Sequence, residues 1–287
     1  FYNNGVIWFC YDEKAALVDD SLPFAQKHNM NYEYLSKADL QKRFPIVNAN
    51  DLHHAYLDPF GGYLKARESC QAVFDAFVRE GGKFVLAHAS VNKNNELELS
   101  NGEKVTADLY IYACGPWLGK LFPNVLSNTI ICTKQEAYYF GTPAQAASLF
   151  NEFPAWIDLD GQDFYYGIPG NAHRGFKIGV DRRGESFDPT TGDRILNPSV
   201  LAHARNFIGH RFPLLKDAPL AESRVCPYEN SPDGNFLLDH HPESDRIWFL
   251  GGGSGHGFKH GPALGELVAG VVEGTKALPS FFAMTSL

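Results

Sequence analysis

A glycine-rich turn near the C-terminus constrains the fold of this chain more than any other feature. The apolar run 247–250 predicts a buried strand that leads into residues 251–257, where five of seven residues are glycine, and then into a helix over 262–272. Glycine lets the backbone approach a flat ligand closely, and a helix N-terminus presents unpaired N–H groups that favour an anion. The pattern indicates either a ligand-binding strand–turn–helix unit or a purely structural turn.

The segment from 65 to 113 has the order of elements found in a dinucleotide-binding sheet. Apolar residues at helical spacing predict an amphipathic helix over 65–80, ended by Gly81 and Gly82. A strand over 84–88 follows, and then a hairpin whose turn is Asn101-Gly102. The continuous apolar run 109–113 predicts a strand covered on both faces of its sheet.

The remaining segments show a different pattern of predicted strands and turns. Runs at 136–140, 164–168 and 176–180 are separated by Gly, Pro and Asn turns and predict an antiparallel sheet. A strand over 6–10 precedes a helical stretch over about 13–28. Further helices are expected from the Ser36 cap to Pro45 and over 199–212. We therefore expect a mixed α/β chain in which a partial Rossmann-like sheet is interleaved with an antiparallel sheet.

Charge and apolar patterning narrow the class of partner. The net charge is −8, without a block of like charges, so a nucleic-acid partner is not expected. No apolar run approaches the roughly 18 residues of a membrane span, and no signal-peptide pattern is visible at the N-terminus. Five scattered cysteines fit a reduced compartment, which predicts a cytoplasmic protein.

Three stretches around the glycine-rich turn, 224–239, 241–243 and 253–259, closely resemble the C-terminal signature of the monomeric sarcosine oxidase family. The resemblance extends to Gly61-Gly62, to Ala113–Trp117 and to Tyr165–Pro169, and it covers nearly the whole chain. It implies an FAD-dependent enzyme of the D-amino-acid-oxidase-like superfamily, which oxidises a secondary or N-methyl amino acid with O2, hydrolyses the imine and releases H2O2.

The resemblance also implies roles for individual residues. Lys177 matches the lysine that promotes the reaction of reduced flavin with oxygen, because a fixed positive charge stabilises the reduced oxygen species. Lys259 matches the residue that binds the substrate carboxylate, and Tyr166 and Tyr228 match the aromatic pair of the substrate pocket. Cys226 matches the site of covalent flavin attachment, a reaction that needs a lowered thiol pKa.

Further positions are assigned to the cofactor by the same resemblance. Gly255 and His256 match the backbone turn beside the flavin and the substrate amine, and Val91 matches the residue near the adenine. The resemblance also assigns cofactor contacts in the two short motifs to Gly115, Trp117, Gly257 and Phe258.

The family's N-terminal βαβ unit with G-x-G-x-x-G has no counterpart here, so a missing N-terminal FAD-binding segment is an expected partner. The predicted segments are 1–60 and 131–222 for a substrate domain, and 61–130 and 223–287 for an FAD-binding domain. A dehydrogenase with another electron acceptor, and an inactive fragment or half of a split enzyme, remain open. Metal binding by His53-His54, His240-His241 or the His256/His260 pair is the weakest alternative, so no metal site is assigned.

Overall fold

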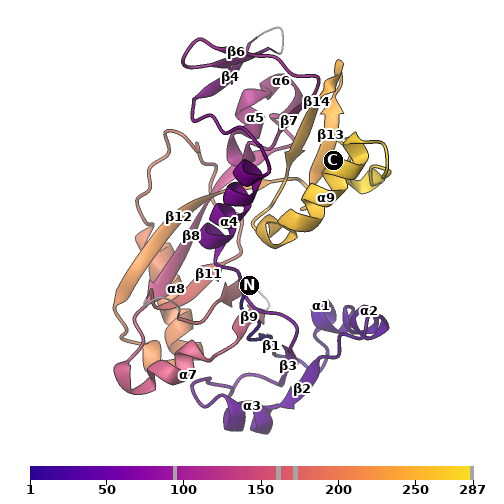
Figure 1. Cartoon of the computed structure of the whole chain (residues 1–287). Helices are drawn as coiled ribbons and strands as arrows, with labels where there is room; N and C mark the ends of the chain where they lie inside the picture. The colour runs from indigo at the N-terminus through magenta and orange to yellow at the C-terminus, as the bar shows by residue number, and fades with distance from the viewer. Residues whose placement is uncertain (93–95, 160–162, 171–173, 285–287) are drawn as a thin grey trace. The chain divides into compact units, whose positions relative to one another are not determined.

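A computed structural model describes residues 1–92, 96–159, 163–170 and 174–284 (Figure 1). Short stretches of the predicted segments 61–130, 131–222 and 223–287 therefore lie outside the described residues. The chain forms two compact units, each assembled from separate stretches. Unit 1 comprises 1–65, 135–183 and 193–226, and unit 2 comprises 66–134, 184–192 and 227–287. Their assignment as substrate domain and FAD-binding domain stays a prediction.

Unit 1 is built on a mainly antiparallel sheet. Its elements, including β8 and β12, which also contribute residues to unit 2, are β1 (Val6–Cys10), α1 (Ala16–Asp19), α2 (Leu22–Lys27), β2 (Glu33–Ser36), α3 (Lys37–Arg43), β3 (His54–Asp58), β8 (Ile131–Phe140), η2 (Ala144–Ala146), α7 (Ala147–Asn151), β9 (Ala155–Leu159), β10 (Phe164–Gly167), β11 (Phe176–Val180), α8 (Pro198–Arg211), η3 (Pro213–Leu215) and β12 (Leu220–Asn230). The strand order is β12-β8-β11-β10-β9-β1-β3-β2, in which β1 and β9 run parallel.

Aromatic side chains fill the core of unit 1. The Trp156 ring stacks on Phe176 with centroids 5.9 Å apart, and Tyr165 stacks on Phe207 of α8 at 3.6 Å. Alternate residues of β11, Phe176 and Ile178, point into this core and are fully buried. The period of two therefore places Lys177 on the opposite face of the strand.

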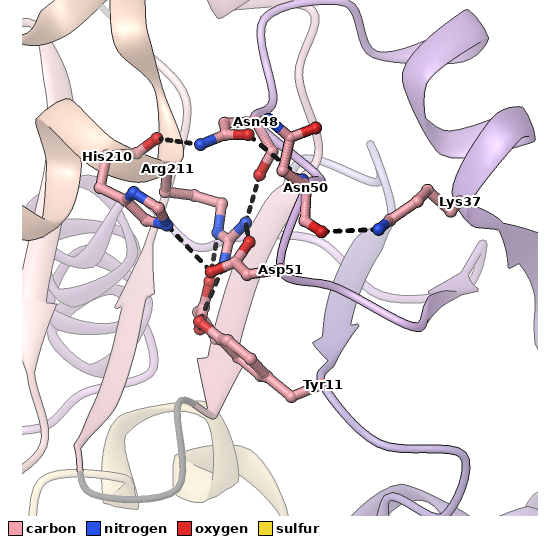
Figure 2. Close-up of polar contacts among 8 residues, drawn as sticks. Tyr11, Lys37, Asn48, Asn50, Asp51, His210 and Arg211 are labelled. Carbon is pink, nitrogen blue, oxygen red and sulfur yellow. Dashed lines mark hydrogen bonds and ion pairs between the residues drawn. The ribbon is translucent and has the colours of Figure 1, made fainter.

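A buried arginine joins distant parts of unit 1 (Figure 2). Arg211 is fully buried at the end of α8. Its guanidinium donates to Asp158 at 2.7 Å, to Asp51 at 2.9 Å and to the Tyr11 hydroxyl at 2.7 Å, and also to the Asn48 carbonyl. Burial alone lowers the pKa of Arg211, but the two carboxylates outweigh it and raise this pKa, so the guanidinium remains charged.

Unit 2 contains two small sheets with helices (Figure 1). Its further elements are α4 (Ala66–Arg79), β4 (Ala89–Val91), β5 (Leu97–Leu99), β6 (Lys104–Val105), β7 (Tyr110–Tyr112), η1 (Gly115–Trp117), α5 (Leu118–Leu121), α6 (Pro123–Leu126), β13 (Leu237–His241), β14 (Ser244–Gly251), η4 (Gly257–His260), α9 (Gly261–Val272) and η5 (Ser280–Phe282). In the order β13-β14-β7, β14 pairs antiparallel with β13 and parallel with β7. The second sheet is the antiparallel β4-β5-β6, and it confirms the hairpin at Asn101-Gly102.

Three sequence predictions of local structure are wrong. Residues 84–88 form no strand, because nothing among the described residues pairs with them along a ladder. Residue 111 of β7 is 44% exposed, so this strand is not covered on both faces by the described residues. The stretch 13–28 forms two short helices instead of one, since Pro23 has no N–H to continue a helix from α1.

The predicted mixed α/β class is confirmed, with both antiparallel and parallel strand pairs present. Within the described ranges, no helix combines the length and apolar character that a membrane crossing requires.

Candidate functional site

Lys177 is half-buried on the face of β11 opposite the aromatic core of unit 1. Its ammonium nitrogen stands 5.0 Å from the centroid of the Tyr166 ring, a distance that allows a cation–π contact. Burial lowers the pKa of Lys177, the neighbouring Cys226 raises it, and Arg174 lowers it further. The structure therefore brings together three residues that the sequence singled out: Lys177, Tyr166 and Cys226.

The size of residue 167 helps to set this arrangement. A Cβ atom on Gly167 would lie 2.1 Å from the backbone oxygen of Lys177 and 2.4 Å from the Trp156 ring. Only glycine allows β10 and β11 to approach so closely at this point. The Tyr166-Gly167 pair of the sequence motif is thus explained by packing next to Lys177.

Cys226 lies in β12 and is partly buried. Burial raises the pKa of its thiol, while Lys177, Arg224 and Arg194 lower it. The net shift is upward, so the free protein does not hold this thiol as the thiolate that covalent attachment needs. The three cations reduce the cost of forming that thiolate.

A second cationic group beside Lys177 was missed from the sequence. Arg174 donates through Nε and Nη2 to the two carboxylate oxygens of Glu222, both at 2.8 Å, and its guanidinium carbon lies 4.4 Å from the centroid of the Tyr139 ring. The sequence contained only an indirect signal for this ion pair. Glu222, Arg224 and Cys226 alternate along β12 and so point to the same face of the strand, which places a carboxylate and a cation beside the predicted site residue Cys226.

In unit 2, the glycine-rich turn packs directly against Tyr228. Gly255 has φ +82°, and a Cβ there would lie 2.2 Å from the Tyr228 ring. Ser254 also has a positive φ, of 44°, which is uncommon for a residue with a side chain. The backbone therefore crosses the ring at a distance that no other residue type allows, and two predicted site residues, Gly255 and Tyr228, are in contact. A Cβ on Gly257 would lie 3.2 Å from the Phe236 ring.

The turn is tied to the end of β12 by hydrogen bonds. The Ser254 N–H donates to the Glu229 carbonyl at 2.8 Å, and the Gly253 N–H donates to the Glu229 carboxyl oxygen Oε1 at 3.3 Å. The Ser231 N–H donates to the Ser254 hydroxyl at 3.2 Å. The sequence patterns did not single out Glu229. An acidic residue near the end of a strand, next to the site residue Tyr228, was the available signal.

The residues after the turn form a short 3₁₀ helix before α9. The Lys259 ammonium donates to the His256 carbonyl at 3.0 Å, and the His256 ring nitrogen Nε2 lies 3.1 Å from the Gly234 carbonyl and donates to it. The ring of Phe258 is about half exposed. His256 and His260 both pack edge-on against Phe236, and the described residues contain no group of three metal-ligating side chains.

The remaining predicted cofactor residues lie elsewhere in unit 2. The Trp117 indole donates to the Thr190 hydroxyl at 2.9 Å, and Gly115 has a φ of +54° in η1. Val91 ends β4 and lines a cavity of about 480 Å³ together with residues 121–125 and 241–243. Since this lining contains no residue of the glycine-rich turn, the structure does not bring Val91 together with Gly255.

A parallel strand pair that ends in a glycine-rich turn before a helix defines an α/β protein of the nucleotide-cofactor-binding class. A match to the DAO family, described as FAD dependent oxidoreductase, covers residues 1–271, and the chain belongs to that family. The family is enzymatic and FAD-dependent.

Named relatives and solved structures agree with this assignment. The chain is 27% identical over 278 residues to monomeric sarcosine oxidase of Bacillus sp. (strain B-0618), covering 94% of this chain and 70% of that protein. It is 25% identical to N-methyl-L-tryptophan oxidase of Yersinia pestis (strain Pestoides F), covering 85% and 66%. A fructosyl peptide oxidase mutant has a TM-score of 0.81 at 16% identity, covering 99% and 74%, and L-proline dehydrogenase from P. horikoshii has 0.80 at 18%, covering 98% and 76%.

The glycine-rich turn of unit 2 has two features that fit a flat polar cofactor such as FAD. Its backbone crosses an aromatic ring without side chains in between, and a buried carboxyl oxygen of Glu229 lacks a partner among the described residues. These are properties of a surface that receives a flat polar ring. A G-x-G-x-x-G sequence for the pyrophosphate does not occur in the 287 residues.

Proposed function

We propose that this protein is an oxidase of a secondary or N-methyl amino acid. In net terms, substrate, O2 and water give the primary amine, a carbonyl product and H2O2, with two electrons and two protons passing from the C–N unit to oxygen. FAD supplies the acceptor for the hydride and the centre at which oxygen is reduced. The observation that carries the proposal is the half-buried cation Lys177 beside Tyr166 and Cys226.

Lys177 stabilises negative charge on oxygen. In a site of low dielectric, a fixed cation stabilises such charge more strongly than it does in water. The guanidinium of Arg174 is held by Glu222 through two hydrogen bonds, and the same carboxylate accepts from Arg224, so both arginines are committed to ion pairs. Lys177 is therefore the cation assigned to oxygen, and this favours an oxidase over a dehydrogenase.

Lys259 and the two tyrosines bind and orient the amino acid. Lys259 offers an ammonium group to the substrate carboxylate, since its hydrogen bond to the His256 carbonyl uses one of three donors. By the family resemblance, Tyr166 and Tyr228 each supply an aromatic ring to the apolar part of the substrate, and Gly255 holds the turn against the Tyr228 ring. We assign the cofactor contacts to Gly115, Trp117, Val91, Cys226 and Gly255–Phe258.

A substrate screen tests the proposal. The protein is loaded with FAD, and peroxide release is measured with sarcosine, other N-methyl amino acids, pipecolate, proline and glycated amino acids. We expect peroxide in proportion to amine consumed with at least one of them. Reduction of an artificial acceptor without peroxide, under air, would support the dehydrogenase instead.

We also propose that full FAD binding requires a further polypeptide segment that carries the G-x-G-x-x-G turn. The supporting observation is an apolar face of unit 2 on α4 and the residues after it. Its members are Val73, Phe74, Phe77, Val78, Phe84, Val85 and Leu86. No residue of α4 is buried, and Leu86 is 90% exposed. A helix of this length is marginal in water unless its apolar stripe is covered.

A strand and a helix of another segment would be suited to pack against this apolar face of unit 2. Strand β7 has an unpaired edge within the described residues, and 84–88 have strand-forming composition without a ladder. About 30% of the Bacillus sarcosine oxidase lies outside the match to this chain, which is length enough for such a unit.

Complementation tests this requirement. The unmatched part of the Bacillus enzyme is added as a separate polypeptide, and FAD binding and the fluorescence of an apolar dye are followed. We expect tighter FAD binding and displacement of the dye, both weakened by Phe77→Glu. FAD binding at full strength by the 287 residues alone, unchanged in Phe77→Glu, would contradict the requirement.

The predicted cytoplasmic location is retained in the proposal. All five cysteines are free, which suits a compartment that keeps thiols reduced. Fractionation of cells that make the protein, with thiol labelling under non-reducing conditions, tests it, and enrichment with a membrane or secreted fraction would contradict it.

A further inference from the structure

A carboxyl group with one unused oxygen lies at the glycine-rich turn of unit 2. Glu229 accepts the Gly253 N–H through Oε1 at 3.3 Å, and its backbone carbonyl accepts the Ser254 N–H at 2.8 Å. Its second carboxyl oxygen, Oε2, is buried and has no hydrogen-bond partner within the described ranges. Buried polar atoms are nearly always hydrogen-bonded, so this oxygen points to a missing partner.

The surroundings of this oxygen are apolar. A Cβ built on Gly251 would lie 3.2 Å from Glu229 Oε2 and 2.8 Å from a methyl carbon of Leu118. Among the described residues, no cation forms an ion pair with Glu229. The titratable group that faces it is Cys114, whose pKa is raised by burial and then by Glu229.

Glu229 and Cys114 lie near each other without an ion-paired cation among the described residues, and this favours the uncharged form of the Glu229 carboxyl. Burial raises the pKa of Glu229, and the backbone N–H groups of Gly253 and Gly252 offset only part of this. A protonated carboxyl has a hydroxyl donor that needs an acceptor. FAD is rich in acceptors, which include ring nitrogens, ring carbonyls, ribityl oxygens and phosphates.

We propose that Glu229 is a positioning residue of the cofactor site, whose carboxyl in its protonated form donates its unused hydroxyl to an acceptor of bound FAD. The inference rests on the assignment of the glycine-rich turn to the flavin. Gly251 and Gly253 border the carboxyl, since a Cβ built on either would lie 3.2 Å from one of its oxygens, and neither residue puts a side chain between the carboxyl and a ligand at the turn. No covalent bond changes, and the proton remains on the carboxyl group.

The consequence is a pH-dependent affinity for FAD. The hydrogen bond is complete below the pKa of the carboxyl in the free protein, and above it the affinity falls by up to about tenfold per pH unit. FAD dissociation constants are measured by fluorescence titration from pH 5 to 8.5, without substrate and with the complementing segment of the Bacillus enzyme present. We expect wild-type binding to weaken by more than about threefold as the pH rises through this range.

Two variants and a control make the test specific. Glu229→Gln keeps a donor and an acceptor but does not ionise, so its affinity stays within about threefold across the range. Glu229→Leu removes the donor and binds FAD about tenfold more weakly at pH 5. Glu273→Gln, a matched change at an exposed residue of unit 2, follows the wild-type profile.

The same pH profile in the wild type and in Glu229→Gln would overturn the inference, as would wild-type protein that binds no FAD at any pH. If Glu229→Leu does not fold, the Glu229→Gln comparison still decides. Peroxide assays run in parallel separate this inference from the proposed function. Normal FAD binding without turnover of any amine contradicts only the substrate proposal, and normal turnover with a flat FAD profile contradicts only the role of Glu229.

Discussion

Replacing Arg211 by Met is expected to destabilise unit 1 more than any surface substitution. The change keeps an unbranched apolar side chain but removes the cation between Asp158 and Asp51 (Figure 2). Asp158, itself fully buried, then retains the Tyr11 hydroxyl, at 2.7 Å, as its one side-chain donor among the described residues. The contact with the Asn48 carbonyl is lost as well.

The magnitude follows from burial. Removing one partner of a buried ion pair costs about 3–5 kcal/mol because the other charge stays desolvated. For a protein of this size, that corresponds to a fall of roughly 10 °C in melting temperature. In urea, with a slope of about 2 kcal/mol per molar, the midpoint falls by about 2 M. Both quantities are measured by circular dichroism.

A double-mutant cycle and a matched control complete the experiment. The double variant Arg211→Met/Asp158→Asn should lose less stability than the sum of the single variants, with a coupling of about 1–3 kcal/mol. Arg43→Met breaks the exposed ion pair with Glu33 at 2.6 Å and should cost less than about 1 kcal/mol. Equal effects of Arg211→Met and Arg43→Met, or strict additivity in the cycle, would refute the reasoning.

Four further substitutions and conditions have defined outcomes. Lys177→Met should slow reoxidation of the reduced flavin by O2 by about 10²–10³-fold in stopped flow, and an unchanged rate would remove its role. Cys226→Ser should release its flavin on acid precipitation where the wild type retains it, and retention by the variant would exclude a thioether at this residue. Gly255→Ala should lower the free energy of unfolding, measured in urea, by about 2–4 kcal/mol, because the residue has a positive φ and the new Cβ would overlap the Tyr228 ring. The control Gly234→Ala, where nothing lies within 4 Å of the new Cβ, should lower it by about 1–2 kcal/mol. Equal losses would show that the ring contact is unimportant. Ion pairs lower the pKa of Glu222 to about 2, so its contribution is complete above its unfolded value and is lost as pH falls from about 4.5 to 2. The urea midpoint should therefore drop less between pH 6 and pH 3 in Glu222→Gln, and parallel drops would contradict this.

Local sequence signals predicted many elements of this fold well. The Ser36 hydroxyl accepts the Asp39 N–H at 3.2 Å and caps α3, as the spacing of these residues indicates. The amphipathic period over 65–80 and the Asn101-Gly102 turn also correspond to structure. These signals succeed because caps, turns and periodicity depend on residues a few positions apart.

Features that depend on distant partners were not predictable. Residues 84–88 have strand composition but no ladder, since a strand needs a neighbour that composition does not supply. In the candidate site, the resemblance identified Lys177, Cys226 and Gly255, whereas Arg174 and Glu229 emerged only from contacts. Their partners, Glu222 and Gly253, are separated from them by long stretches of sequence.

The ion network of Arg211 has a consequence for synthesis on the ribosome. Tyr11, which its guanidinium contacts, is translated 200 residues earlier. At about 5–20 residues per second, roughly 10–40 s pass between the synthesis of Tyr11, which follows strand β1, and the synthesis of Arg211. During that interval Asp158, once made, has the Tyr11 hydroxyl but not the guanidinium of Arg211 as a side-chain partner, so burial of its carboxyl between β1 and α8 is disfavoured until α8 has left the exit tunnel.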